Sequence, residues 1–450
     1  MTSASATPNR PEVIAFLDDI KANPLDDTPR LILADWLEER NDPRGTFLRL
    51  DTELATLNDF EEAYWELKEK RDRIWAAHYL DWLGPLNGSL DERGALGVSS
   101  DRGLFCISMP RETLLRKKLQ SLADTECWAW IQTLRTGISQ KGVTRLNDNP
   151  LLARISTLDL RSGSLHPNGA KDLARTSFLS GLRGLNLTSN WIGDMGVRAI
   201  RRSDNLRNLV YLNLESNKLR PDGIKALAGA ALQLDELILD RNRLGNAGIN
   251  ALISAKWLKS VRALSLNRTG IRRSGAHALF ECSRLANLRR LSIADCGLEI
   301  SSARYLKKAS FVANLTHLSI HENGSPVEAL TEMAEVEWNN LASLDVSSHL
   351  LGAEALQILL DAPSLTGQLR ALNLFSNALD DQEIVALSQS ELLSQLRSLS
   401  LSIWRLSRET LKKLFASPSV EQMLSLDFGQ NGNEHLTEVL PSSKLTALRR

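Results

Sequence analysis

The stretch LRGLNLTSNWIGDMGVRAI, residues 182–200, contains the pattern that decides the fold. Its first part, L-x-x-L-x-L, alternates with a period of two, which predicts a short strand whose leucines point inward. Its second part contains Gly196 and Ile200 four residues apart and predicts an amphipathic helix that returns the chain. One strand and one helix cannot bury their apolar sides alone, so the stretch predicts stacking against further copies of itself.

Further copies follow along the chain. LVYLNLESNKLRPDGIKAL (209–227) and LDELILDRNRLGNAGINAL (234–252) repeat both parts of the pattern. Repeats of this length predict a solenoid in which stacked units share one core and their strands form a parallel sheet on the concave side. The central strand leucine recurs every 25 to 28 residues in eleven units, at Leu158, Leu185, Leu212, Leu237, Leu264, Leu291, Leu318, Leu344, Leu372, Leu399 and Leu426.

A polar residue recurs three positions after the last strand leucine, where a short side-chain amide can bond the backbone of the turn. It is asparagine at Asn190, Asn217, Asn242 and Asn377. In other units the position holds Thr269, Cys296, His349 and Trp404, so we do not expect an unbroken asparagine ladder. The seventh unit has Gly324, Ser325 and Pro326 where its turn should continue, which predicts a local irregularity.

The eleven units resemble leucine-rich repeats. Their N-x-[Leu/Ile]-x-x-x-Gly-[Ile/Val] segments look like the subclass found in ribonuclease inhibitor and the Ran GTPase-activating proteins. The resemblance covers residues 152–450. It implies an α/β fold, a leucine-rich repeat horseshoe with parallel strands on the concave side and helices on the convex side, preceded here by an all-helical N-terminal domain.

Residues 10–83 read as helices only, with Leu31, Leu33, Ala34 and Leu37 as an apolar stripe in the second helix. The stretch from Asp26 to Leu50 resembles the "repeat-companion" domain of certain bacteria, a short helical module that precedes repeats. The resemblance implies no biochemical activity. It rests on matches at Asp26, Arg30, Leu31, Ala34, Asp35, Trp36, Leu37, Glu38, Glu39, Asp42, Pro43, Phe47, Leu48, Arg49 and Leu50.

We therefore expect four parts: a disordered tail (1–9), a helical repeat-companion domain (10–87), an α/β cap of the solenoid (88–151) and about eleven repeats (152–450). In the cap, residues 102–134 predict a strand from Leu104 to Met109 and then a helix. The first ten residues lack the apolar run of a signal peptide, and no apolar run approaches the ~18 residues of a membrane span. We expect a cytoplasmic protein without membrane contact.

The formal net charge of zero conceals blocks of opposite sign. Residues 1–100 have a net charge of −9, residues 152–310 of +14 and residues 311–450 of −8. These blocks predict a contact between the acidic N-terminal domain and the basic repeats, within one molecule or between molecules, or a contact of either with a partner. Four charged residues are expected on the exposed surface of the helical module: Asp35, Glu38, Glu39 and Arg44.

The sequence shows no nucleophile with a base, no metal cage and no phosphate loop, so we expect no catalytic residue, no cofactor and no metal ion. His317 and His321 lie in the same unit, but on a strand they are ~13 Å apart, which is too far for one metal ion. The four cysteines match no zinc pattern.

Positions beside the core leucines face the concave surface and carry the variety of a binding surface. We expect a non-enzymatic protein that binds a protein partner there. One alternative is a regulator that inhibits or activates an enzyme such as a nuclease, a GTPase or a protease. Another is a nucleic-acid-associated factor that uses the basic segment 152–310, although few aromatic residues interleave with its charges. The expected partner-binding residues are Tyr211, Glu215, Glu236, Asp240, Arg290, His317, His321 and Phe375.

Overall fold

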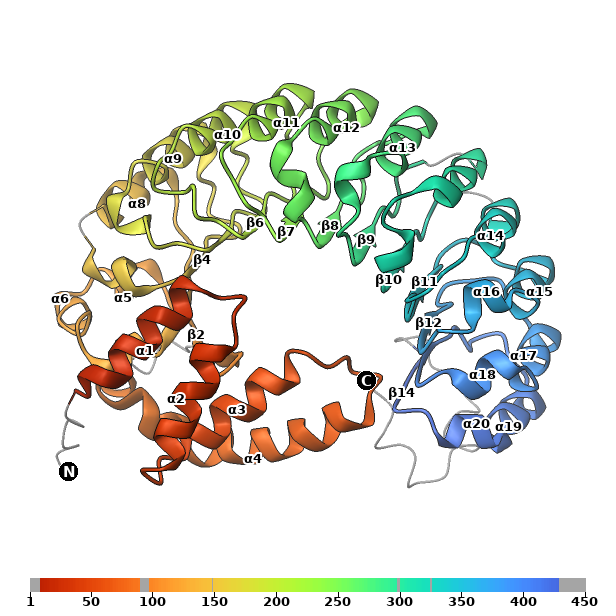
Figure 1. The fold of residues 1–450 in the computed structure, drawn as a ribbon, viewed down its shortest axis with the longest axis horizontal. Helices are drawn as coiled ribbons and strands as arrows, with labels where there is room; N and C mark the ends of the chain where they lie inside the picture. The colour runs from red at the N-terminus through yellow and green to blue at the C-terminus, as the bar shows by residue number, and fades with distance from the viewer. Residues whose placement is uncertain (1–8, 90–96, 148, 298–299, 324–325, 429–450) are drawn as a thin grey trace. The chain divides into compact units, whose positions relative to one another are not determined.

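The computed structural model describes residues 9–89, 97–147, 149–297, 300–323 and 326–428. The chain divides into two compact units, the first comprising Met1–Asn58 and Ala63–Leu234, the second Asp59–Glu62 and Asp235–Arg450. In each unit the strands lie together on one side and the helices of the repeats on the other (Figure 1). The mixed α/β architecture with parallel strands, predicted from the period of the leucines, is confirmed. Nearly all of the tail predicted to be disordered, and Gly324 and Ser325 of the seventh unit, lie outside the described residues.

The N-terminal part is helical, with α1 (Pro11–Ala22), α2 (Thr28–Glu38), α3 (Arg44–Leu54) and α4 (Glu62–Leu83). The apolar side of α2 differs from the prediction. Leu33, Ala34 and Leu37 are fully buried, whereas Leu31 is 40% exposed. Since residues three and four apart share one side of a helix, Leu33 and Leu37 face the core together and Leu31 lies off their stripe.

A tight crossing joins α2 to α3. Asn41 has a φ of 56°, in the left-handed region that asparagine tolerates, and it turns the chain sharply after α2. Gly45 then lies so close to α2 that an added Cβ would be 2.7 Å from the carbonyl oxygen of Ala34. The sequence Asn41-Asp42-Pro43-Arg44-Gly45 therefore ends one helix, starts the next and lets the two helices touch.

Charged side chains attach this helical part to the residues that follow it within the first unit. The guanidinium of Arg10 donates to Glu126 and lies 2.8 Å from the carboxylate of Asp42. The ammonium of Lys21, which is 5% exposed, donates to the carbonyl oxygens of Ala129 and Arg154. Burial lowers the pKa of Lys21 to about 7. Buried charge is tolerated only with partners, so these contacts fix where α1 lies.

Two basic side chains of the first repeats also contact the helical part. Arg154 lies 3.5 Å from the carboxylate of Asp18, and the side chain of Arg183 donates to the carbonyl oxygen of Ala22 at 2.9 Å. Part of the contact predicted from the opposite charges of the N-terminal domain and the repeats is therefore present inside one chain.

Between the helical part and the repeats lie three strands. β1 (Val98–Asp101) pairs antiparallel with β2 (Leu104–Ser108), and β2 pairs parallel with β3 (Ile131–Arg135). The prediction of one helix after β2 was wrong. Short helical turns occupy that stretch: α5 (Arg111–Leu114), α6 (Lys117–Gln120) and α7 (Glu126–Ala129). Leu134 of β3 pairs in register with Leu158, so residues 131–135 are the strand of a further, degenerate unit.

The remaining strands of the first unit are β4 (Thr157–Asp159), β5 (Gly184–Asn186) and β6 (Tyr211–Asn213), which pair parallel in register. Their central leucines Leu158, Leu185 and Leu212 are fully buried. The helices of these units are α9 (His166–Leu173), α10 (Gly193–Arg201) and α11 (Pro221–Ala228), preceded by the short α8 (Gln140–Val143). The stretch 182–200 thus forms one strand and one helix, as its two periods predicted.

The second unit continues the same plan. Its parallel strands are β7 (Glu236–Ile238), β8 (Ala263–Ser265), β9 (Arg290–Ser292), β10 (His317–Ser319), β11 (Ser343–Asp345), β12 (Ala371–Asn373), β13 (Ser398–Ser400) and β14 (Ser425–Asp427). Its α-helices are α12 (Gly245–Ile253), α13 (Arg273–Phe280), α14 (Pro326–Ala334), α15 (Ala353–Leu360), α16 (Pro363–Thr366), α17 (Asp381–Ser388), α18 (Glu391–Gln395), α19 (Arg408–Ala416) and α20 (Pro418–Glu421). In the sixth unit a 3-10 helix, Ile300–Lys308, takes the place of the α-helix.

A ladder of buried side chains runs along the turns that follow the strands. Asn217 is fully buried, and its amide nitrogen donates to the carbonyl oxygens of Leu187 and Glu215 at 2.7 and 3.0 Å. Its amide oxygen accepts from the backbone N–H groups of Asn190 and Ile192. One side chain therefore satisfies backbone groups in its own unit and in the preceding unit.

The ladder tolerates other residue types where they keep these bonds. Thr269 donates its hydroxyl to the carbonyl oxygen of Leu266, and the thiol of Cys296 donates to the same oxygen. His349 is buried, with its ring nitrogen Nε2 at 2.8 Å from the carbonyl oxygen of Ile320. Trp404 departs from the pattern and is 49% exposed. Asn323, which was not predicted as a member of the ladder, is buried and donates to the carbonyl oxygens of Ile293 and Ile320.

We predict that Asn217→Ala lowers the free energy of unfolding by about 2–3 kcal/mol, because backbone groups of two units lose buried hydrogen-bond partners. The matched control is Asn168→Ala on the exposed side of α9, which should change it by less than about 0.5 kcal/mol. Denaturant unfolding of both variants is the measurement. Equal effects of the two substitutions would contradict the ladder's role.

Candidate binding surface on the second unit

The register of the second unit places side chains in straight rows across its sheet. Glu236, Ala263, Arg290, His317 and Ser343 form one row, each on a neighbouring strand. Two positions further along the strands, a second row contains Ile238, Ser265, Ser292, Ser319 and Asp345. Because successive side chains of a strand alternate, both rows leave the sheet on the side opposite to the buried leucines between them. We call this surface the strand face.

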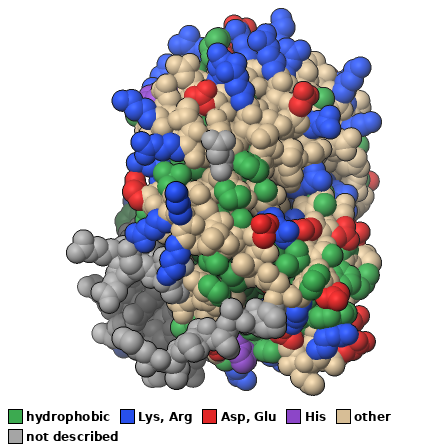
Figure 2. All heavy atoms as spheres, turned by 90° about the vertical axis from the view of Figure 1, so that its left-hand side faces the viewer, with side chains coloured by type: hydrophobic (Ala, Val, Ile, Leu, Met, Phe, Trp, Pro, Cys, Tyr) green, Lys and Arg blue, Asp and Glu red, His purple; other side chains and the backbone are tan. Residues whose placement is uncertain are grey.

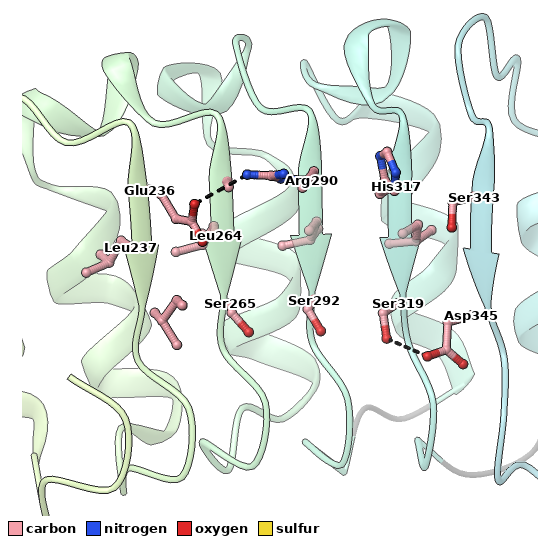
Figure 3. A pocket seen from close by; sticks show the side chains of 14 residues that line it. Glu236, Leu237, Leu264, Ser265, Arg290, Ser292, His317, Ser319, Ser343 and Asp345 are labelled. Carbon is pink, nitrogen blue, oxygen red and sulfur yellow. Dashed lines mark hydrogen bonds and ion pairs between the residues drawn. The ribbon is translucent and has the colours of Figure 1, made fainter. Parts of the chain in front are cut away.

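A shallow groove of about 330 Å³ runs over the strand face and is lined by the residues of both rows (Figure 3). Its floor is the small side chains of Ala263, Ser265 and Ser292. Larger side chains stand at its rims, with Glu236, Arg290 and His317 on one side and Asp345 on the other. The groove is therefore apolar and hydroxylic at its floor and charged at its rims.

Arg290 and Glu236 form an ion pair that spans three strands. The guanidinium of Arg290, on β9, reaches across Ala263 to the carboxylate of Glu236 on β7, with 3.3 Å between nitrogen and oxygen. Ala263 is in register with both residues on the strand between them, and its small side chain leaves the space for this path. Figure 3 shows the ion pair. Burial raises the pKa of Glu236, and the positive charge of Arg290 opposes that shift. Arg290 remains 58% exposed, so it stays available to a ligand.

His317 is the apolar end of the same rim. Burial lowers the pKa of its imidazole, and the charge of Arg290 lowers it further. The ring of Phe60, from the segment Asp59–Glu62 that belongs to the second unit, lies 6.4 Å from the imidazole between ring centroids. Phe60 itself is 7% exposed. His317 thus has an aromatic neighbour and a pKa below its ordinary value.

Ser319, His321 and Asp345 form a polar cluster at the opposite rim. The hydroxyl of Ser319 lies 2.9 Å from Nδ1 of His321, and a carboxylate oxygen of Asp345 lies 3.4 Å from the same nitrogen. The hydrogen bond to Asp345 raises the pKa of His321 despite partial burial. Burial of Asp345 acts to raise its own pKa, but the bond to His321 and the backbone N–H of Ser347 outweigh it, and the pKa is lowered.

The order of contacts in this cluster differs from that of a catalytic triad. In a triad the serine and the carboxylate engage opposite nitrogens of the imidazole, so that the ring passes a proton from one side to the other. Here Ser319 and Asp345 both approach Nδ1 of His321. Over the described part of the chain, no group of three or more His, Cys, Asp or Glu side chains is placed to hold a metal ion.

The residues expected to bind a partner fall into three groups. Glu236, Arg290 and His317 line the groove, and His321 joins it through Asp345. Asp240 instead accepts from the backbone and side chain of Asn267, in the turn beyond the strands, and Phe375 follows β12 half-buried. Tyr211 and Glu215 belong to the first unit, so they form no part of this groove.

The charged residues expected on the helical module also differ among themselves. Asp35 and Glu38 both pair with Arg49, and Glu39 is 73% exposed beside Arg40. Arg44 does not fit the expectation, because its side chain is only 13% exposed. It lies between the carboxylates of Asp42 and Glu126, at 2.6 and 3.1 Å, and so belongs to the attachment of the helices.

Asp345 and the serines of the second row were not among the residues expected to form the site. A signal for them existed, since the position after the central leucine is Ser265, Ser292, Ser319 and Asp345 in consecutive units. Because most residues at that position are small and polar, the sequence alone did not predict that they contribute to a binding site. The change from serine to aspartate at Asp345 was the informative difference.

Comparison with known proteins identifies the repeat type. Two segments, residues 182–200 and 205–228, match the model of leucine-rich repeats. A sequence comparison with curated proteins gives no match. No helix within the described ranges is long and apolar enough to cross a membrane.

Three solved structures match this chain at TM-scores below 0.5. The crystal structure of a Rad7 and Elc1 complex in yeast matches with 16% identity over 91% of this chain and 92% of that chain, at a TM-score of 0.45. A TLR13–ssRNA13 complex matches with 19% identity over 71% and 42%, at 0.38. An internalin, InlF, from Listeria monocytogenes str. 4b F2365 matches with 18% identity over 72% and 90%, at 0.37. Similarities this low carry no information about what this chain binds.

We predict that the two histidines of the strand face titrate in a fixed order. As the pH falls, His321 becomes protonated before His317, because Asp345 favours its charged form while burial opposes the charge on His317. A folded-state pKa above the ordinary 6.5 or so means that the pair of His321 and Asp345 stabilises the fold fully below that pH. Its contribution is lost as the pH rises through the raised pKa.

NMR titration of the imidazole signals measures this order. Asp345→Asn should lower the pKa of His321 toward its ordinary value, since the amide keeps an oxygen for the backbone N–H of Ser347 but lacks the charge. His317 serves as the internal control, and its titration should not move. A variant in which His321 keeps its raised pKa would contradict the pairing.

Proposed function

We propose that this protein binds a segment of another protein on the strand face of its second unit, without catalysing a reaction. The observation that carries the proposal is the groove itself. Charged side chains of both signs line the two rims of the groove, and small side chains form its floor between them. All of them project from neighbouring strands of one sheet. Varied side chains on a regular frame are how repeat proteins build extended binding surfaces.

The chemistry of the groove favours a polypeptide as its ligand. Arginine and aromatic residues are the side chains that most often anchor protein interfaces. Arg290 offers a guanidinium for a carboxylate, and the imidazole of His317 lies beside the phenyl ring of Phe60. On the other rim Asp345 and His321 offer an acceptor and a donor. A ligand with alternating charged and apolar side chains would satisfy both rims.

The open form of the groove supports binding rather than catalysis. Paired acid and base groups need a site that excludes water to reach perturbed pKa values. Glu236 and Asp345 are 33% and 27% exposed in their side chains, and each already has a cationic or imidazole partner. The groove therefore presents groups for recognition, with no dry pocket around a reacting atom.

We further propose finer assignments for two parts of the chain. The units are repeats of the ribonuclease-inhibitor and Ran GTPase-activating subclass, which their Asn-to-Gly spacing supports in 182–200 and 209–227. Residues 10–87 form a repeat-companion domain, which the four helices and the tight Gly45 crossing support. The domain limits at residues 87 and 151 belong to the same proposal.

We predict that Arg290→Ala weakens binding of the protein partner about ten-fold or more, because a partly buried charge-assisted hydrogen bond is lost at the centre of the surface. The matched control is Arg289→Ala. This neighbouring residue is exposed and has the same charge, but it does not line the groove. Its substitution should change the dissociation constant by less than about two-fold.

Affinity purification from the native cell identifies the partner, and calorimetry with the purified partner measures both variants. Equal losses in Arg290→Ala and Arg289→Ala would show that only net charge matters and would reject the groove. Partner binding untouched by Arg290→Ala together with His317→Ala would reject it as well. Titration of the partner's own activity, where it has one, tests whether the complex is regulatory.

A further inference from the structure

Trp191 occupies a backbone position that suits glycine. It has a φ of 55°, in the left-handed region, and it is 47% exposed. Bulky side chains seldom adopt this conformation, because the Cβ approaches the neighbouring backbone. Trp191 directly follows the ladder residue Asn190, so its conformation belongs to the turn after the strand, where several other units also have a left-handed residue.

Other units show what the turn requires. In the same register position Gly270 and Gly297 have φ values of 71° and 62°, and the non-glycine residues Ser164, Lys218 and Leu350 have φ values of 56°, 58° and 55°. At neither glycine would an added Cβ meet an atom within 4 Å, so the position opens to the outside of the protein. The fold therefore needs no side chain here. At Trp191 the chain has a large indole where glycine would relieve the backbone and leave the core unchanged.

The indole is held in place by its neighbours in the first unit. The imidazole of His166 lies 5.5 Å from the Trp191 ring between centroids, and the ammonium of Lys218 lies 4.7 Å from the ring centroid. His166 and Lys218 belong to the units before and after Trp191, so they flank the indole along the stack. A fixed, half-exposed indole loses little entropy when a partner covers it.

Exposed apolar and basic side chains also occur in the unit of Trp191 and in the units next to it. Met195, at the start of α10, is 63% exposed, and the side chain of Arg198 lies beside its sulfur. Figure 2 shows the face at the left-hand side of Figure 1, where α8 and α9 lie. Lys and Arg side chains are spread over this face. The exposed basic residues on or next to α9, α10 and α11 are Lys171, Arg175, Arg198, Arg201, Arg202, Lys218, Arg220 and Lys225.

We propose that Trp191, Met195 and the basic residues around them form a second interaction surface, which takes an acidic polypeptide segment with apolar side chains. Trp, Met and Arg are the residues enriched at the centres of protein interfaces. The surrounding positive charge selects an acidic partner and speeds its approach. This surface lies in the first unit and is independent of the groove proposed above.

The arrangement favours a polypeptide over a nucleic acid. Single-stranded nucleic acids bind by stacking their bases on open aromatic faces. The ammonium of Lys218 lies over the indole ring of Trp191, and the imidazole of His166 approaches it at an angle of 56°, so both compete with a base for the faces of the ring. An edge contact, together with the thioether of Met195, suits aliphatic and aromatic side chains of a protein.

The test uses the full chain and a fluorescent peptide of about 20 residues, rich in Asp and Glu with Leu and Phe at helical spacing. We expect this peptide to bind, and Trp191→Gly to weaken binding about ten-fold or more. Because glycine adopts the turn freely, the unfolding midpoint of Trp191→Gly should stay near that of the unaltered chain. Met195→Gln, at an exposed helix position, should weaken binding with no change in the turn.

Leu350→Gly is the matched control. Leu350 has the same register position and a φ of 55°, is 80% exposed and lies in the second unit. Its substitution should leave peptide binding unchanged, as should Arg290→Ala, which separates this surface from the groove. Three outcomes would overturn the proposal: no binding of the peptide, equal binding of a peptide with Ser in place of Leu and Phe, or equal binding of an oligothymidylate that Trp191→Gly weakens.

Discussion

The buried ladder of turn residues is the constraint on which the repeats depend. Every unit must reverse direction after its strand, and the reversal leaves backbone N–H and C=O groups inside the protein. Asn190 and Asn217 satisfy these groups in two units at once. Their bonds fix the distance and register between neighbouring units, and the leucines then fill the space behind the strands.

The ladder also explains which positions are free to vary. Thr269, Cys296 and His349 replace asparagine because each still supplies a donor to the same kind of carbonyl oxygen. Residues outside the ladder and the buried leucines do not have to supply a hydrogen-bond donor to the backbone or fill the core. The strand face can therefore place Arg290 beside Ala263, and the turn can hold Trp191 where another unit has glycine. The residues proposed to bind partners therefore lie at positions that do not stabilise the fold.

The sequence predicted the repeated elements because their spacing is regular. Leucines at a period of two and an asparagine at a constant distance require no knowledge of the rest of the chain. The strand β3 escaped prediction because its unit is degenerate and its apolar residues, Trp128 to Leu134, also suit a helix. The burial of Arg44 escaped prediction because its partner Glu126 lies 82 residues away along the chain.

The candidate groove was predicted in part from the sequence. Arg290, His317 and Glu236 were predicted as surface residues from their register position alone. That Arg290 pairs with Glu236 across Ala263 follows only from the register of three strands, together with the size of the side chain between them. The different titration of His317 and His321 depends on burial and on Asp345, which a repeat pattern does not reveal.

Local pairing changes the meaning of the charge blocks. The basic segment 152–310 predicted a contact with the acidic N-terminal domain, with a partner or with a nucleic acid, yet many of its arginines lie close to carboxylates. Arg161 lies beside Asp159, Arg262 beside Asp235 and Arg268 beside Asp295, each within 4 Å. The negative charge of each carboxylate cancels most of the positive potential of its arginine. Water and salt screen the remaining potential, so these pairs attract a distant acidic partner only weakly. The basic residues on the exposed sides of α9, α10 and α11 outnumber the carboxylates there, and the nearby Lys218 lies over the exposed indole of Trp191. Charge and apolar surface therefore coincide there, and this coincidence carries more information about a partner than the net charge of the segment.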